Sequence, residues 1–326
     1  MKRRTFTALF AAMAAALAFG AAHAADYPSK TITLIVPFSA GGPTDTVARL
    51  LGQAMAADLK TTVIVENVAG AGGTIGAARV ANAPPDGHTI FLHHIGQSTA
   101  PALYRKLPFH PVNDFETIGL VTEVPMTLIA RGNFPPNNLK ELVAYVRANK
   151  DKVTYANARL GAASHLCGML FMTAIETDLL TVPYKGTGPA MNDLLGGTVD
   201  FMCDQTTNTT AQIKGGKVKV YAVTTKNRVP SLPDVPTAAE AGLANFQVGI
   251  WHGLYAPKGT PKAIVERLNK ALKVALHEPT LIKRFADLGT EPVSDAQSTP
   301  DAHRKLLVAQ IATWDPIIKK AGQYAD

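Results

Sequence analysis

The chain reads TITLIVPFSAGGPTDTVARLLGQAMAADL from Thr31 to Leu59. It begins with an apolar run at 31–37 that is typical of a buried strand, continues through two glycines, and ends in an apolar stripe with helical spacing over 44–59. The same order recurs with a strand at 62–65, a helix at 74–82 and a strand at 89–92. Strand starts about 30 residues apart match the length of a strand–helix–strand unit. We therefore predict a parallel sheet covered by helices on both faces.

Strands and helices keep alternating through the rest of the chain. Apolar runs and helical stripes predict strands at 126–130, 153–156, 180–183, 199–202, 218–223 and 247–255, and helices at 139–149, 164–175, 189–195, 209–214, 261–276, 280–288 and 300–321. A length of 326 residues suits two domains better than one. We expect an α/β fold of two lobes with a cleft between them. Residues 25–125 and 244–326 would form lobe 1, because one strand and three helices are too few for a third lobe, and residues 126–243 would form lobe 2.

Composition and charge exclude several classes of protein. Hydrophobic residues make up 47% of the chain and charged residues 17%, which excludes intrinsic disorder and a coiled coil. The net charge is +7, but three positive charges lie within the first four residues, and 1–24 contain no Asp or Glu. The remainder carries +4 (29 − 25), with its basic residues scattered. A nucleic-acid partner is therefore not expected, whereas small anionic ligands are compatible with this charge.

The first 24 residues have the features of an export signal. A basic start precedes an Ala-, Leu- and Phe-rich stretch that ends in Ala22-His23-Ala24, a spacing that signal peptidase accepts. We predict cleavage after Ala24 and a periplasmic mature chain. An uncleaved membrane anchor is the alternative, and the pair Arg3-Arg4 leaves export by the twin-arginine route open.

Two cysteines, Cys167 and Cys203, lie 36 residues apart. In an oxidising compartment they could form a disulfide. Two buried thiols are the favoured interpretation, because both residues lie inside apolar runs. Two cysteines also exclude a disulfide-rich scaffold and a four-cysteine metal site.

Two glycine-rich loops follow the first two strands, Phe38–Asp45 and Ala69–Gly76. In open α/β sheets, ligands bind beyond the carboxyl ends of the strands. Glycine lets the backbone approach a ligand closely, and Pro43 suits the first turn of a helix. Free N–H groups at that helix start would face an anion. The two loops together predict an anion cradle, although glycines that serve only tight turns are the alternative.

Neither a cofactor nor a catalytic centre is expected. Ile75 stands where the dinucleotide fingerprint needs a glycine, and no Gly-Lys-Ser/Thr follows either loop. The hydrolase and metalloprotease motifs G-x-S-x-G and H-E-x-x-H are missing from the sequence. His93 and His94 have no third ligand at short spacing, so a place at the cleft edge or on the surface is favoured over a metal site. Ser164-His165 opens a predicted helix, where Ser is a common N-cap.

Seven motifs along the chain resemble, in order, those of the Bug-type periplasmic solute receptors, which serve tripartite tricarboxylate transporters. They are Val36–Asp45, Val65–Gly76, Ala83–Gly87, Ser164–Leu166, Val182–Gly186, Asp193–Gly197 and Leu232–Thr237. The likeness covers the whole predicted mature chain.

The resemblance implies a two-lobed receptor of the periplasmic-binding-protein type (type II-like) that closes on a small carboxylate. It implies no catalytic residues and no cofactor, and it implies permease subunits as partners or, in some cases, a sensor protein. An exported enzyme is the more remote alternative. Carried over, the ligand contacts are Ser39, Ala40, Gly41, Gly42, Thr44, Asp45, Gly70, Ala71, Gly72 and Gly73 in the first lobe, and Asn157, Ala158, Ser164, His165, Tyr184 and Asp204 in the second. We add His93 as a residue of the cleft edge.

The sequence departs from the family pattern before Ser164. The loop there is usually rich in glycine, but this chain has Arg159 in it. An arginine at the cleft could hold a second carboxylate of the ligand with two hydrogen bonds. A solvated surface arginine is the alternative interpretation.

Overall fold

The computed structural model describes residues 27–322 and 324, so the predicted signal peptide and its cleavage site lie outside the described residues. The strands are β1 (Ile32–Val36), β2 (Val63–Asn67), β3 (Thr89–His94), β4 (Phe115–Arg131), β5 (Thr154–Asn157), β6 (Leu180–Pro183), β7 (Phe201–Gln205), β8 (Val218–Val223) and β9 (Gly249–Pro257). The helices are α2 (Pro43–Leu59), α3 (Thr74–Ala81), α4 (Gly96–Leu103), α5 (Leu139–Ala148), α6 (Ala163–Ile175), α7 (Thr187–Gly196), α8 (Thr206–Lys214), α9 (Lys262–Leu276), α10 (Pro279–Asp287) and α11 (Pro300–Ala321), with a short 3-10 turn, η1 (Ala71–Gly73), before α3.

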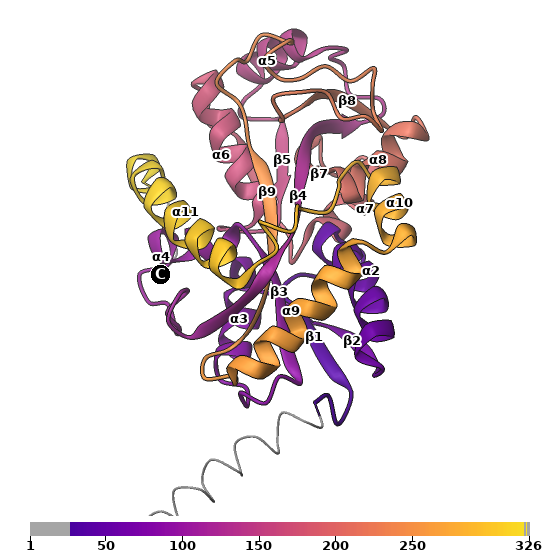
Figure 1. The fold of residues 1–326 in the computed structure, drawn as a ribbon. Coiled ribbons are helices and arrows are strands. Elements are labelled where there is room, and N and C mark those ends of the chain that lie inside the picture. Colours follow the sequence, from indigo (N-terminus) through magenta and orange to yellow (C-terminus); the bar gives the residue numbers. More distant parts are fainter. Residues whose placement is uncertain (1–26, 323, 325–326) are drawn as a thin grey trace, which may run out of the picture.

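These strands form one continuous sheet in the order β2-β1-β3-β9-β4-β7-β5-β6, with β8 also paired to β4. Strands β4 and β9 run through the middle of the molecule and join its two halves (Figure 1). The pairing of β4 changes along its length: up to Pro125 its partner is β9, and from Met126 its partners are β7 and β8. The prediction of a two-lobed α/β fold is confirmed. The lobe boundaries at 125/126 and 243/244 stay predictions.

Parallel pairing is found where strand–helix–strand units were predicted. Strand β1 is parallel to β2 and β3, and β5 is parallel to β6 and β7. A wholly parallel sheet is nevertheless wrong, because β9 is antiparallel to β3 and β4, and β4 is antiparallel to β7 and β8. The antiparallel strands β4 and β9 carry the chain from one half to the other and back.

Helices cover the sheet on both sides. On one side α2 and α9 pack over β1 and β3 through fully buried side chains such as Val47, Leu51, Leu268 and Leu272. Helix α11 packs against α4 and β4, with Leu307 and Ile318 among its buried residues. None of the helices in the described part of the chain is long and apolar enough to cross a membrane.

Cys167 and Cys203 form a disulfide that joins α6 to β7, with their Cα atoms 6.1 Å apart. The favoured interpretation as two thiols is therefore wrong. Both residues are fully buried, as predicted from their apolar surroundings. The fold also brings α6 next to β7, so that the two cysteines meet. Burial and pairing are compatible, and sequence spacing alone does not report the distance between a helix and a strand.

A candidate ligand site between the two halves

The loop after β1 leads directly into the start of α2. Gly41 has a φ of +77°, a conformation that favours glycine, and Gly42 is the N-cap residue. Pro43 occupies the first helical turn, as predicted. The first intrahelical hydrogen bond runs from Thr46 N–H to Gly42 O over 3.0 Å, so the N–H groups of Thr44 and Asp45 precede it. The start of α2 therefore presents backbone donors beyond the carboxyl end of β1.

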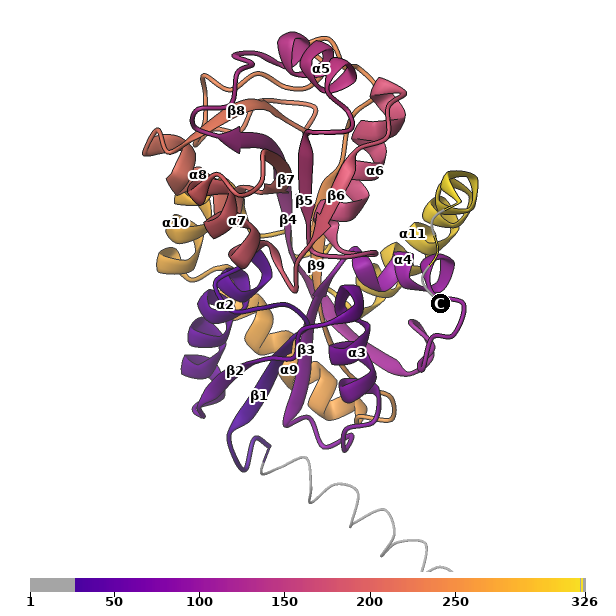
Figure 2. The same ribbon diagram turned by 180° about the vertical axis from the view of Figure 1, so that it is seen from behind.

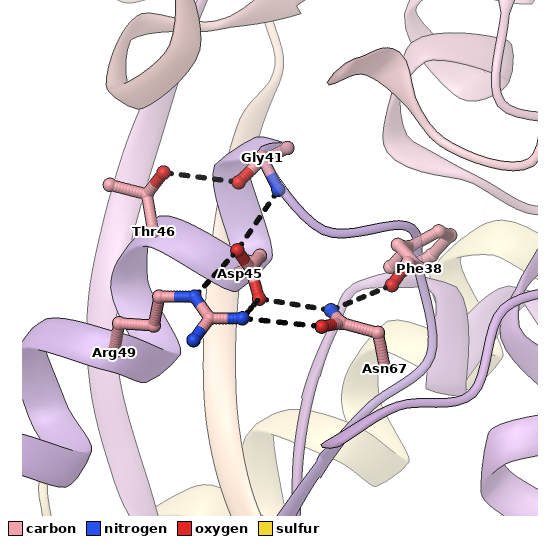
Figure 3. Close-up of polar contacts among 7 residues, drawn as sticks. Phe38, Gly41, Asp45, Thr46, Arg49 and Asn67 are labelled. Carbon is pink, nitrogen blue, oxygen red and sulfur yellow. Dashed lines mark hydrogen bonds and ion pairs between the residues drawn. The ribbon is translucent and has the colours of Figure 1, made fainter. Parts of the chain in front are cut away.

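Asp45 holds this loop in shape (Figure 3). Its buried carboxylate accepts hydrogen bonds from Gly41 N–H (3.0 Å), Arg49 Nε (2.9 Å) and Asn67 Nδ2 (2.9 Å). Burial opposes ionisation, but the hydrogen bonds from Arg49, Gly41 and Asn67 outweigh it and hold the pKa of Asp45 below its ordinary value. All these partners belong to its own half of the molecule, so Asp45 organises the cradle from behind. Its predicted contact with the ligand stays a prediction.

The loop after β2 is built almost wholly from left-handed backbone. Ala71, Gly72 and Gly73 have φ values of +44°, +61° and +105°. A Cβ atom on Gly72 would lie 1.8 Å from the carbonyl oxygen of Leu160, so the loop is in close contact with the second half of the molecule. A Cβ on Gly73 would lie 3.0 Å from the ring of His93. Glycine is required here by conformation and by packing.

A small cavity of about 20 Å³ lies between the two halves of the molecule, with room for roughly one water molecule. Its lining comprises Phe38, Pro43, Thr44, His94, Ala158, Ala162, Ala163, Ser164, Thr187, Asp204 and Gln205. These residues include the first or capping residues of four helices, α2, α6, α7 and α8. A helix N-terminus carries a partial positive charge and unpaired N–H groups. Four of them around one cavity favour an anion there.

Two ionisable side chains line this cavity. Asp204 belongs to the second half of the molecule, and His94 belongs to the first half. The Asp204 carboxylate is 1% exposed and accepts hydrogen bonds from Thr187 Oγ1 (2.9 Å), Gln205 N–H (2.9 Å) and Asn208 Nδ2 (2.6 Å). Burial raises the pKa of Asp204 to about 6, although the hydrogen bonds from Asn208, Gln205 and Thr187 favour its charged form. A buried carboxylate with a raised pKa that lines a cavity is typical of a functional site.

A second, open groove of about 640 Å³ lies on the other side of the loop 157–162. Its lining includes Ala71, Tyr104, Asn157, Arg159, Leu160, His165 and Tyr324. Arg159 is exposed, has a φ of +73° and donates its N–H to Asn157 Oδ1 over 2.9 Å. Arg159 thus lines the outer groove and not the small cavity. A larger groove of about 850 Å³, lined by α9 and the start of α11, lies away from both glycine loops.

The structure therefore divides the predicted site residues. Thr44, Ala158, Ser164 and Asp204 line the cavity, and Ala71, Asn157, Arg159 and His165 line the groove. The remaining predicted residues are in neither lining. Ser39, Ala40, Gly41 and Gly42 face α7, Gly70, Gly72 and Gly73 shape the second loop, and Tyr184 donates its hydroxyl to Asp193 over 2.6 Å. Whether each touches a ligand stays a prediction.

His93, predicted at the cleft edge, is buried behind Gly73 beside Phe38 and Phe91. Its Nδ1 has no hydrogen-bond partner within residues 27–322 and 324. Burial, together with His252, lowers the pKa of His93 to about 3. His94 accepts Gly96 N–H at Nδ1 over 2.9 Å and stacks on Phe38 at 4.7 Å. No group of three or more His, Cys, Asp or Glu side chains that could hold a metal ion occurs in the described part of the chain.

Sequence reasoning missed several cavity residues, notably Phe38, Thr187 and Gln205, whereas His94 had been considered for the cleft edge. Gln205 ends β7 and caps α8, so a search of strand ends for polar residues would have found it. Thr187 begins α7 directly after Gly186 of the predicted motif. Phe38 lines the cavity with its ring, for which a sequence offers no comparable signal.

Direct contacts close the space between the halves. Ser39 N–H donates to Lys185 O over 3.4 Å, and the Tyr104 hydroxyl donates to Leu160 O over 2.9 Å. A Cβ atom on Gly186 would collide with Ser39, and one on Gly188 would lie 3.1 Å from Ala40 O. Figure 2 shows the start of α7 beside α2. The structure is a closed arrangement of the two lobes.

Comparison with known proteins agrees with this architecture. Residues 47–323 match the model of the tripartite tricarboxylate transporter family receptor (TctC). Among solved structures, the periplasmic binding protein BugD is 55% identical, with a TM-score of 0.90, and covers 92% of this chain and 100% of its own. MatC from Rhodopseudomonas palustris with bound malate is 44% identical, with a TM-score of 0.87 and coverage of 90% and 100%. Another R. palustris protein, with adipate, is 32% identical, with a TM-score of 0.86 and coverage of 91% and 99%.

The match to the family model begins within α2 and extends beyond the end of α11, and the likeness to BugD includes both lobes. The predicted periplasmic-binding-protein fold is thereby confirmed. The chain belongs to the tripartite tricarboxylate transporter family of receptors and is a Bug-type member of it.

Proposed function

We propose that this receptor binds a small organic carboxylate in the cavity between its lobes and delivers it to the permease subunits of a tripartite tricarboxylate-type transporter. The observation that carries the proposal is the convergence of α2, α6, α7 and α8 on one small cavity. Each helix start adds unpaired N–H groups and the positive end of a dipole. Family membership and the ligands of MatC and of the adipate-containing relative support the same class of ligand.

The donors for the carboxylate would be neutral groups. Thr44 and Asp45 offer backbone N–H groups, and Ser164 Oγ, which accepts Ala158 N–H over 2.9 Å, can donate its own proton. The cavity lining, all of which lies in the described part of the chain, contains no Lys or Arg. Neutral donors in a closed site hold an anion effectively, because water is excluded and the donors are already oriented.

The ligand would enter while the lobes are apart. A cavity of about 20 Å³ holds no organic acid, whereas small-molecule sites usually measure about 300–1,000 Å³. We propose that the lobes separate by bending of β4 and of the segment before β9, near the boundaries 125/126 and 243/244, and close again on the ligand. The outer groove, with Asn157, Arg159 and His165, would then be the part of the cleft that takes the remote end of a longer diacid.

A thermal-shift screen of carboxylic acids, followed by calorimetric titration, tests the proposed function. A ligand at 100 times its dissociation constant adds about 2.7 kcal/mol of stability, enough to raise the melting temperature by several degrees. Matched amides such as succinamide serve as uncharged controls and should give no shift. Equal shifts with acids and amides, or none with any acid, would contradict carboxylate binding.

Export to the periplasm is part of the same proposal. It is supported by membership of a family of periplasmic receptors and by the predicted cleavage site after Ala24. N-terminal sequencing of the protein recovered from a periplasmic extract should begin at Ala25. Recovery in the membrane fraction of a chain that keeps Lys2 would contradict it.

A further inference from the structure

A disulfide and a tyrosine hydroxyl both join helix α6 to strand β7 inside the second lobe. Cys167 of α6 is paired with Cys203 of β7, and both side chains are fully buried. The hydroxyl of Tyr155, a fully buried residue of β5, donates a hydrogen bond to Ser164 O of α6 over 2.6 Å. The same hydroxyl accepts a hydrogen bond from Cys203 N–H over 3.3 Å. The helix and the strand are therefore connected twice, once covalently and once through a shared hydroxyl.

Both connections lie next to residues that line the small cavity. Cys203 immediately precedes Asp204, and Cys167 lies three residues after Ser164, less than one helical turn away. Ser164 and Asp204 both belong to the lining of the cavity. The disulfide therefore cross-links the two elements that present these polar side chains, at a point close to each of them.

Ser164 and Asp204 in turn hold other parts of the second-lobe lining. Ser164 Oγ accepts Ala158 N–H over 2.9 Å, and Ala158 belongs to the loop between β5 and α6. The Asp204 carboxylate accepts hydrogen bonds from Thr187 Oγ1 over 2.9 Å and from Asn208 Nδ2 over 2.6 Å, which connect it to the starts of α7 and α8. A shift of α6 against β7 would therefore move these groups relative to one another.

The place of this disulfide in the fold bears on its role. A disulfide stabilises a protein wherever it lies, because it restricts the unfolded chain. A disulfide that joins two walls of a binding site also restricts their relative movement in the folded protein. A site whose groups are already in place binds its ligand without the cost of ordering them.

We propose that the Cys167–Cys203 disulfide and the Tyr155 hydroxyl are positioning elements of the ligand site, in addition to stabilising the fold. They fix the start of α6 relative to the end of β7 and thereby raise the affinity for the bound acid. The inference rests on the proposed function but assigns no ligand contact to any of the three residues. If the binding arrangement is populated for only a fraction of the time, the apparent affinity falls by that fraction for every acid that uses it.

The first test removes the disulfide in the double variant Cys167→Ala/Cys203→Ala, in which alanine adds no polar group to the core. Calorimetric titrations at pH 7.5 compare it with the wild type, using succinate, glutarate, citrate and benzoate as probes. For each acid that binds the wild type, the affinity of the variant should fall by a similar factor, about tenfold if the binding arrangement is populated for about a tenth of the time. The melting temperature should fall as well.

Tyr155→Phe is the second variant, because it keeps the ring and the disulfide. It removes only the hydroxyl that connects Ser164 O to Cys203 N–H. The affinity for the same acids should fall by a smaller factor, about threefold, since the covalent connection still holds α6 to β7.

Leu142→Ala is the matched control for the loss of stability. Leu142 is fully buried in the core of the same lobe, but its helix, α5, lies at the end of that lobe that is far from the first lobe (Figure 1). This variant should lower the melting temperature about as much as loss of the disulfide does. It should leave the affinity for every acid unchanged.

Affinity and stability together separate a positioning role from a structural one. If both variants melt earlier but bind every acid as the wild type does, the inference is wrong while the carboxylate receptor stands. If no acid binds the wild type, the proposed function fails, and hydrogen exchange without ligand decides whether the positioning exists. Amides at 163–166 and 203–206 should exchange faster in both variants than in Leu142→Ala, and equal exchange would overturn the inference. If the double cysteine variant does not fold, Tyr155→Phe alone decides by the same two measurements.

Discussion

At the scale of single residues, the loop before α2 depends on the buried carboxylate of Asp45, which is 3% exposed. We expect Asp45→Asn to lower the free energy of unfolding by about 1.5–3 kcal/mol, the range for hydrogen bonds to a charged group. The loss arises because Arg49, Gly41 N–H and Asn67 lose their charged acceptor. Urea-induced unfolding at pH 7, followed by circular dichroism, measures it.

The matched control for Asp45 is Asp287, which also pairs with a basic residue at i,i+4 spacing. The Lys283–Asp287 pair is 3.1 Å long, but both side chains are more than half exposed. Asp287→Asn should therefore cost at most about 0.5 kcal/mol. Similar losses for the two variants would mean that the hydrogen bonds around Asp45 contribute little. The contribution of Asp45 should also vanish at acid pH, because its folded pKa lies below the unfolded one and stability is lost as the pH falls through it.

Gly72 shows which properties of a single residue the sequence does not predict. Its place in the motif predicted a backbone close to the ligand. The structure adds a φ of +61° and a distance of only 1.8 Å between Leu160 O and the place that a Cβ atom on Gly72 would take. Any side chain at Gly72 would strain the loop and push the lobes apart, so Gly72→Asp cannot report a ligand contact alone. Motif positions could be predicted, but backbone conformation and contacts across the cleft could not.

At the scale of elements, the packing of α11 on the sheet buries His303. The side chain is fully buried beside Tyr255 and Trp251, with ring centroids 4.4 Å and 6.0 Å away. Neither of its nitrogens has a hydrogen-bond partner in the part of the chain that the structure describes. Burial lowers the pKa of His303 to about 3. Docking of α11 therefore requires a neutral imidazole.

We predict that stability falls steeply between pH 6.5 and pH 4.5. A histidine whose folded pKa is depressed binds its proton only in the unfolded state, so the free energy of unfolding falls as the pH drops below the unfolded pKa of about 6.5. Each such histidine contributes roughly 1 kcal/mol per pH unit, and His93 and His252 act in the same direction. Urea titrations at pH 7.5, 6.5, 5.5 and 4.5 give the slope.

His303→Leu should flatten that slope by its own share, because the neutral side chain needs no proton in either state. His277→Gln is the control: this histidine lies on the surface at the end of α9. It should leave the slope unchanged. An unaltered slope in His303→Leu would show that the burial of His303 does not oppose protonation of its ring.

Most elements could be predicted because their apolar patterns have a clear period, as in α2 with Val47 and Leu51 facing the core. The first half of β4 and the whole of α4 could not. Proline interrupts both patterns: Pro125 lies inside β4 and Pro101 inside α4. Pro125 is tolerated because it lies where β4 exchanges β9 for β7 and β8. The Cys167–Cys203 disulfide could not be predicted either, because the sequence does not show that α6 and β7 become neighbours.

At the scale of the whole molecule, the lobes meet through small residues. The loop Ala40–Gly42 of the first lobe lies against the start of α7 in the second. The small cavity adjoins this contact, since Pro43 and Thr187 belong to its lining. Closure and ligand binding should therefore be coupled, because a change that holds the two lobes apart also widens the site and admits water to its donors.

Gly188 offers a direct test of that coupling. A Cβ atom there would lie 3.1 Å from Ala40 O and 3.2 Å from Gly42 N, both backbone atoms of the opposite lobe. Gly188→Val should destabilise the closed state by about 1–3 kcal/mol, the usual cost of overpacking, and so weaken the best acid from the screen about 5- to 150-fold. Small-angle scattering should show less contraction of the variant with saturating ligand. Gly196→Ala, in the same helix with no atom within 4 Å of its added Cβ, should bind and contract as the wild type does. Normal affinity and normal contraction in Gly188→Val would mean that the ligand does not require this closure.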